Sequence, residues 1–181
     1  SVVERLKEIA EEIIRRIEEL NKEHNKRNRE IAETIERLNR EHNELNKTLV
    51  REMKEIKRDK GKDEEVTKTI EKLREELERH LDKLDKDVKK LLDDLRRHNR
   101  ELDREVRRLL EELRKLAEEL RKDIESEVLK KIEEDLRRLL RKHEENSKES
   151  EKHVEEVEER HRRNAEDSKR HVEKVKEEVD R

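Results

Sequence analysis

Residues 73–98 read LREELERHLDKLDKDVKKLLDDLRRH and show the pattern that the whole chain follows. From Val66 to Ile124, leucine, isoleucine, valine or histidine recurs in steps of four and three residues, and the order of steps repeats every eighteen residues. Eighteen residues make five whole turns of an α-helix. A face with this repeat keeps the same position around the helix, whereas a face with a seven-residue repeat drifts. The pattern therefore predicts long, nearly untwisted helices that pack side by side.

The composition points the same way. The chain has 181 residues, of which 58% are charged and 27% hydrophobic, with no aromatic residue, no proline, no cysteine and one glycine. Such a composition is typical of long helices. Intrinsic disorder is the rival interpretation for so polar a chain, but the regular apolar spacing argues against it. We expect one all-α domain over residues 1–181.

Breaks in the pattern divide this domain into three helices. Gly61, the only glycine, is a natural helix terminator, and Asp63 is a good N-cap for the helix that follows. Past Ile124 the apolar residues change phase, which predicts a second turn near residue 125 with Asp123 or Ser126 as the next cap. The predicted fold is a long antiparallel up-down-up three-helix bundle with helices at about 2–60, 64–122 and 126–181. One uninterrupted helix over 64–181 is the alternative.

All eight histidines fall on the apolar face. In an antiparallel pair of helices, residues equally far from the turn lie at the same level. His24 and His98 are equally far from Gly61, and so are His42 and His80. The third helix places its own polar residues close to the same levels. Two equivalent clusters follow, about 27 Å apart along the helix: His24, Asn28, His98, His143, Asn146, Ser150 and His153 in one, and His42, Asn46, His80, His161, Asn164, Ser168 and His171 in the other.

These residue types can form a buried hydrogen-bond network without burying net charge. Neutral histidine and asparagine each offer a donor and an acceptor, and serine can act as either. We expect His143 and His161 at the margins of the clusters, and no Asp or Glu beside the histidines on the core face. The flanking asparagines can face the core or the solvent: Asn21, Asn25, Asn39 and Asn43. A second apolar column should widen the core, with a partner-binding face as the alternative: Leu92, Leu110, Val154 and Val172.

Several functions are disfavoured. The net charge of −3, from 51 basic and 54 acidic residues, gives no strong field to attract nucleic acid or membranes. No apolar run approaches the ~20 residues of a membrane span, and no signal peptide is visible. No set of nucleophile, base and orienting residue suggests an enzyme. We expect no cofactor, no small-molecule ligand and no metal site, although histidine is a common metal ligand.

The repeat, the charged surface and the matched polar levels resemble computationally designed helical bundles. The histidine clusters are similar to the buried networks of designed pH-responsive bundles. The resemblance implies a protein with no natural biochemical activity whose effector is the proton. Designed pH switches of this kind are often oligomers of helical hairpins, whereas this chain supplies three helices itself. A monomer is therefore favoured, and a homo-oligomer is possible.

Two other functions compete with a pH-responsive bundle. One is a rigid structural rod whose networks serve only packing specificity, and the other is a bundle that binds a transition metal through histidine. If the stability depends on pH, we expect acid to release the third helix first, from about His143 onward. Beyond Leu140 the core-facing positions of this helix are mostly polar, with Val157 and Val175 as the apolar exceptions.

Overall fold

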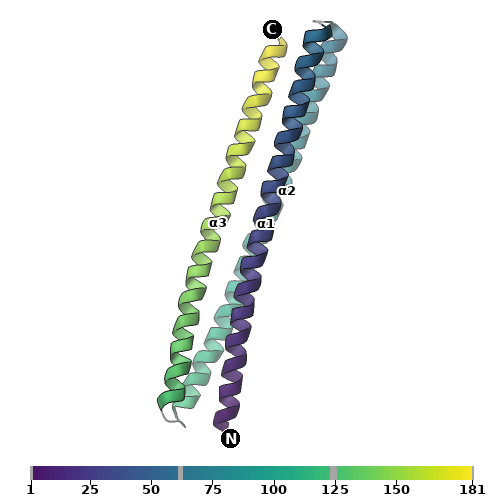
Figure 1. The fold of residues 1–181 in the computed structure, drawn as a ribbon. Helices are drawn as coiled ribbons and strands as arrows, with labels where there is room; N and C mark the ends of the chain where they lie inside the picture. The colour runs from purple at the N-terminus through teal and green to yellow at the C-terminus, as the bar shows by residue number, and fades with distance from the viewer. Residues whose placement is uncertain (1, 61–62, 123–125, 181) are drawn as a thin grey trace. The chain divides into compact units, whose positions relative to one another are not determined.

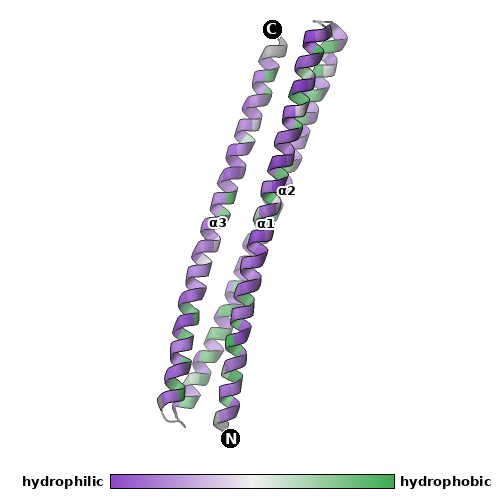
Figure 2. Cartoon of the chain, viewed as in Figure 1, coloured by the Kyte–Doolittle hydropathy of each residue, from purple (hydrophilic) through white to green (hydrophobic). Residues whose placement is uncertain are grey.

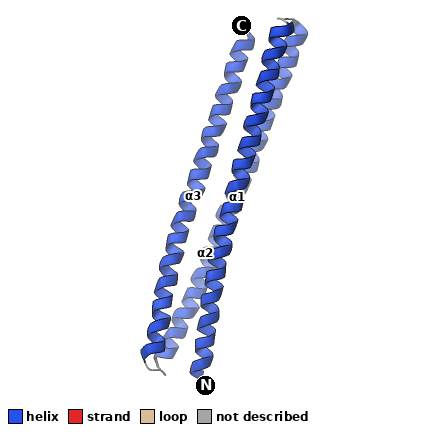
Figure 3. Ribbon diagram, in the orientation of Figure 1, coloured by secondary structure: helices blue, strands red, loops and turns tan. Residues whose placement is uncertain are grey.

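The structure is a computed structural model that describes residues 2–60, 63–122 and 126–180. It contains three helices, α1 (Val2–Lys60), α2 (Glu64–Arg121) and α3 (Ser126–Asp180). Figure 3 shows helix over almost all of the described chain, and those residues include no strand. The predicted all-α fold of three packed helices is confirmed.

Asp63 begins α2 as an N-cap. Its backbone carbonyl accepts a hydrogen bond from the amide of Thr67 at 3.1 Å, and its carboxylate accepts one from the amide of Glu64 at 2.8 Å. These two bonds satisfy groups that a helix start otherwise leaves unpaired. The other predicted turn residues, Gly61 and Asp123, lie outside the described residues. Ser126 is the first residue of α3, but its side chain is also outside the description.

An ion pair excludes the alternative of one helix over 64–181. Arg121, at the end of α2, donates a hydrogen bond to the carboxylate of Glu133 in α3. Twelve residues of continuous helix would hold these two residues about 18 Å apart along the axis. The chain therefore reverses between α2 and α3, and the single-helix alternative is wrong.

The chain divides into two compact units. The first unit comprises residues 1–30 and 94–154, and the second comprises 31–93 and 155–181. Each unit contains a segment of α1, α2 and α3, which Figure 1 traces by colour. The boundaries fall between the two predicted clusters, so each cluster belongs to one unit. The single domain over 1–181 stays a prediction.

The core of the first unit is made by all three helices. Ile17, Leu113, Leu120 and Leu139 are almost completely buried in it. Contacts between α1 and α2 follow the antiparallel order, because Arg16 pairs with Glu105 while the later residue His24 stacks on the earlier residue His98.

The second unit has an apolar core of its own. It includes Met53, Ile70, Leu77 and Val175.

The four residues of the second apolar column are buried, as the sequence predicts for a wider core: Leu92, Leu110, Val154 and Val172.

The rest of each helix surface is charged, and Figure 2 shows hydrophilic residues along every helix with hydrophobic ones at intervals. Many charges pair within one helix. Arg114, for example, contacts Glu111 at 2.6 Å and Glu118 at 3.0 Å. Exposed pairs of this kind contribute only about 0.3–0.5 kcal/mol each, so packing of the core face must supply most of the stability. No helix among the described residues is long and apolar enough to cross a membrane.

The first test concerns this core. Leu113 is 0% exposed, whereas Leu140 on α3 of the same unit is 43% exposed. Leu113→Ala should lower the free energy of unfolding by about 2–5 kcal/mol, because it removes buried methyl groups and leaves a cavity. Leu140→Ala is the matched control and should change it by less than about 0.5 kcal/mol. Urea denaturation followed by circular dichroism measures both, and equal losses would contradict this packing.

Candidate functional site

The polar residues predicted to face the core are withdrawn from solvent. None of the fourteen is exposed, and eight are buried: His24, Asn28, His42, Asn46, His143, Ser150, His161 and Ser168. The other six are half-buried: His80, His98, Asn146, His153, Asn164 and His171. Of the flanking asparagines, Asn21 is buried, Asn39 and Asn43 are half-buried, and Asn25 is exposed.

In the first unit, Ser150 of α3 joins two side chains of α1. Its hydroxyl lies 2.6 Å from His24 Nε2 and accepts a hydrogen bond of 2.9 Å from Asn28 Nδ2. Because Asn28 can only donate through this atom, the hydroxyl proton of Ser150 is available for a neutral His24 ring. This three-residue contact therefore suits an uncharged histidine.

In the second unit, two histidines contact each other directly. His42 Nδ1 of α1 lies 3.0 Å from His80 Nδ1 of α2, and the two rings are stacked with centroids 5.2 Å apart. One Nδ1 must donate and the other must accept. The accepting Nδ1 carries no proton, so at least one of the two rings has to be neutral. His24 and His98 also stack, with centroids 6.4 Å apart. Both pairs are the ones that the sequence predicts to face each other.

Burial lowers the pKa of three of these histidines and so favours their neutral form. It lowers the pKa of His24 from its ordinary 6.5 to about 4, and the charges of His98 and His143 lower it further, against an opposing effect of Asp103. The pKa of His42 also falls to about 4, first through burial and then through His80 and His161.

The pKa of His98 is lowered as well. Burial is the largest cause and the charge of Arg27 adds to it, while Glu101 and Glu23 oppose the change. A buried group resists the charged form because it has lost its water.

The remaining two buried histidines have carboxylate partners, which we did not predict from the sequence because they lie one position off the core face. His143 Nε2 lies 2.6 Å from Asp103 Oδ1, and His161 Nε2 lies 3.0 Å from Asp85 Oδ1. Both aspartates belong to α2, one residue past the apolar positions Leu84 and Leu102. From there the carboxylate reaches the histidine of α3 while remaining partly open to solvent.

The aspartates are held in their charged form. Burial alone would raise the pKa of Asp103, but hydrogen bonds from His143 and Arg107 lower it below its ordinary 3.8. The pKa of Asp85 is lowered in the same way, with burial opposed by hydrogen bonds from His161 and Lys89. Each aspartate can thus accept from a neutral or a protonated imidazole.

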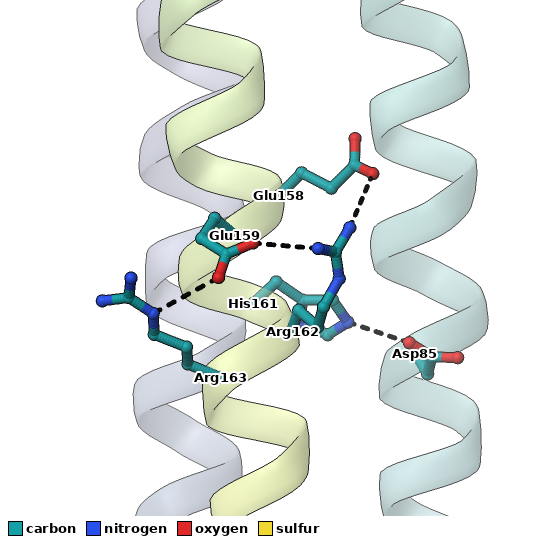
Figure 4. Close-up of polar contacts among 6 residues, drawn as sticks. All are labelled: Asp85, Glu158, Glu159, His161, Arg162 and Arg163. Carbon is teal, nitrogen blue, oxygen red and sulfur yellow. Dashed lines mark hydrogen bonds and ion pairs between the residues drawn. The ribbon is translucent and has the colours of Figure 1, made fainter.

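His161 has an acceptor at each ring nitrogen. Besides Asp85, its Nδ1 lies 3.2 Å from Asn39 Oδ1, which also accepts a hydrogen bond of 3.0 Å from Asn164 Nδ2. A ring can donate to both acceptors only when it carries two protons. Figure 4 shows that the neighbouring Arg162 pairs with Glu158 and Glu159, while His161 contacts Asp85.

The hydrogen-bonded groups are smaller than the predicted clusters. His153 and His171 are half-buried, and no hydrogen bond joins either one to another described residue. Some buried atoms also lack a partner among the described residues, including His42 Nε2, Asn46 Oδ1 and His98 Nε2. No group of three or more His, Cys, Asp or Glu in the described part of the chain could hold a metal ion.

The fold and these contacts define a three-helix bundle with buried histidine, asparagine and serine. The chain is similar to a solved structure described as a "computationally designed three helix bundle", with a TM-score of 0.57 and 21% sequence identity. The match covers 98% of this chain and 83% of that one. No family model matches the chain, and no curated protein does. At this identity the likeness shows the fold alone.

The histidine–aspartate contact can be tested by substitution. Asp85→Asn keeps an oxygen that a neutral His161 can donate to, but removes the charge that balances a protonated ring. The variant should therefore lose about 1–3 kcal/mol of unfolding free energy, because His161 exchanges a charged partner for a neutral one. Asp82→Asn is the control, because Asp82 is exposed on the same helix. Urea titrations would contradict the contact if Asp85→Asn and Asp82→Asn behaved alike.

Proposed function

We propose that the chain is a designed bundle without a natural biochemical activity, and that its buried histidines make its stability depend on pH. The contact of 3.0 Å between His42 Nδ1 and His80 Nδ1 carries the proposal, because it fails when both rings are protonated. The repeat in the sequence and the likeness to a designed bundle support an artificial origin.

The sign of the pH dependence follows from the lowered pKa values. His24 and His42 have pKa values of about 4 in the folded chain and about 6.5 when unfolded. Between these values the unfolded chain binds more protons than the folded chain. The stabilisation is therefore complete above about pH 6.5 and is lost as the pH falls toward 4.

The size of the effect is large for a protein of this kind. A difference of one pKa unit corresponds to about 1.4 kcal/mol. Each of the two histidines then contributes on the order of 3 kcal/mol across the window. A typical domain has a total stability of about 5–15 kcal/mol, so protonation of both rings would remove much of it.

We also propose that acid weakens the contacts of α1 before those of α3, which differs from the expectation from the sequence. Protonation of His143 or His161 turns its hydrogen bond with Asp103 or Asp85 into an ion pair, which still joins α3 to α2. Protonation of His24 or His42 instead places a charge on a ring whose hydrogen-bond partner, Ser150 or His80, is not a carboxylate. We therefore place the first loss of structure in acid at the contacts of α1.

Replacement of the two histidines whose pKa values are lowered to about 4 tests the proposal. The native chain should lose several kcal/mol of unfolding free energy between pH 7.5 and pH 4.5. A variant with His24→Leu and His42→Leu should lose less than half as much, because leucine does not titrate. The matched control carries His153→Leu and His171→Leu, which removes one half-buried histidine from each unit, and should behave like the native chain.

Two results would overturn the proposal. Equal stability of the native chain at both pH values would favour a rigid bundle whose polar groups serve packing specificity. A melting temperature that rises with zinc and falls again with a chelator would favour the metal-binding alternative. Hydrogen exchange at pH 4.5 locates the loss, which should be larger in α1 than in α3.

A further inference from the structure

The first unit contains a small cavity beside its histidine group. It measures about 10 Å³ and is lined by all three helices, with His24, Asp103 and His143 on its wall. Three amide side chains also line it: Asn21, Asn99 and Asn146. Asn21 is only 6% exposed. Leu20, Leu102 and Val106 also line the wall, so the cavity has polar and apolar sides and is formed by residues of a single unit.

Each of these three amides has a buried atom without a protein partner. The atoms are Asn21 Nδ2, Asn99 Oδ1 and Asn146 Nδ2. Two of them are donors and one is an acceptor. Buried polar atoms are rarely left without a hydrogen bond, and three of them around one cavity require a ligand that both accepts and donates.

A single water molecule meets these requirements. A volume of about 10 Å³ is near the minimum for one water, which needs two to four polar partners. The water can accept from Asn21 and Asn146 and donate to Asn99. Its second hydrogen then points to another acceptor on the wall, for which the Asp103 carboxylate is suited. A larger anion does not fit this volume, and the amide nitrogens of Asn21 and Asn146 can only donate hydrogen bonds, so they cannot bind a metal ion.

The second unit provides an internal comparison, because its equivalent residues lie eighteen positions away. Asn39 and Asn164 are equivalent to Asn21 and Asn146, and they contact each other directly at 3.0 Å. Leu81 stands at the position equivalent to Asn99, and Ala165 at the position equivalent to Ser147. Leu81 is 5% exposed. The second unit thus has Leu81 and Ala165 where the first has Asn99 and Ser147, and its two asparagines bond to each other directly.

We propose that the first unit binds one structural water molecule, which bridges Asn21, Asn99 and Asn146, and that the second unit binds none at the equivalent place. The identities at positions 99 and 147 specify the site. The proposal does not depend on the pH response, because all three bridging groups are amides that do not titrate.

Oxygen-17 magnetic relaxation dispersion counts long-lived water molecules and tests the proposal on the full chain at pH 7.5. A variant with Asn99→Leu and Ser147→Ala gives the first unit the wall of the second, and should have one long-lived water fewer than the native chain. A variant with Leu81→Asn and Ala165→Ser makes the reverse change, and should have one more. Circular dichroism verifies that each variant folds.

Water–protein cross-relaxation in NMR then locates the site. The side-chain amides of Asn21 and Asn146 should show contacts with a long-lived water, and those of Asn39 and Asn164 should not. A native chain without any long-lived water would overturn the proposal. So would an unchanged count in a folded variant of either kind, since the reverse change tests the same two positions independently.

Discussion

A histidine ring in the core of a helical bundle needs a hydrogen-bond partner that suits its charge, and this constraint shapes both units. Where the partner is another histidine or a serine, as for His42 and His24, the ring is held neutral. Where the partner is a carboxylate, as for His143 and His161, the contact tolerates a proton. Histidine is therefore held neutral at one kind of contact and can carry a proton at the other.

The two kinds of contact join different helices. The neutral pair His42–His80 joins α1 to α2, and His24–Ser150 joins α1 to α3. The carboxylate contacts both join α3 to α2. In the proposed pH response, acid would weaken the neutral contacts and leave the carboxylate contacts in place, so α1 would carry the pH-sensitive interfaces. Protonation would act on one helix of the bundle before the others.

Much of this arrangement could be predicted from the sequence. The eighteen-residue repeat and the distances from Gly61 were enough to place His24 beside His98 and His42 beside His80. The phase change after Ile124 was enough to place a turn between α2 and α3. These features depend on helical periodicity and chain reversal, which the spacing of residues fixes.

The identity of the hydrogen-bond partners could not be predicted in the same way. Asp85 and Asp103 lie one position off the apolar face, and whether such a side chain turns inward depends on its rotamer and on the neighbouring helix. One signal was available, because the two aspartates are eighteen residues apart, as are His143 and His161. Asn99 carried no such signal, since its equivalent is Leu81 and the repeat fails there.

The central claim is that burial keeps His24 and His42 neutral well below the ordinary pKa of histidine, and a pH titration of their ring signals by NMR tests it most directly. The account predicts midpoints near pH 4 for both rings in the folded chain, or loss of the folded signals before the midpoint is reached. Midpoints near the ordinary value of about 6.5, with the folded spectrum retained, would contradict it.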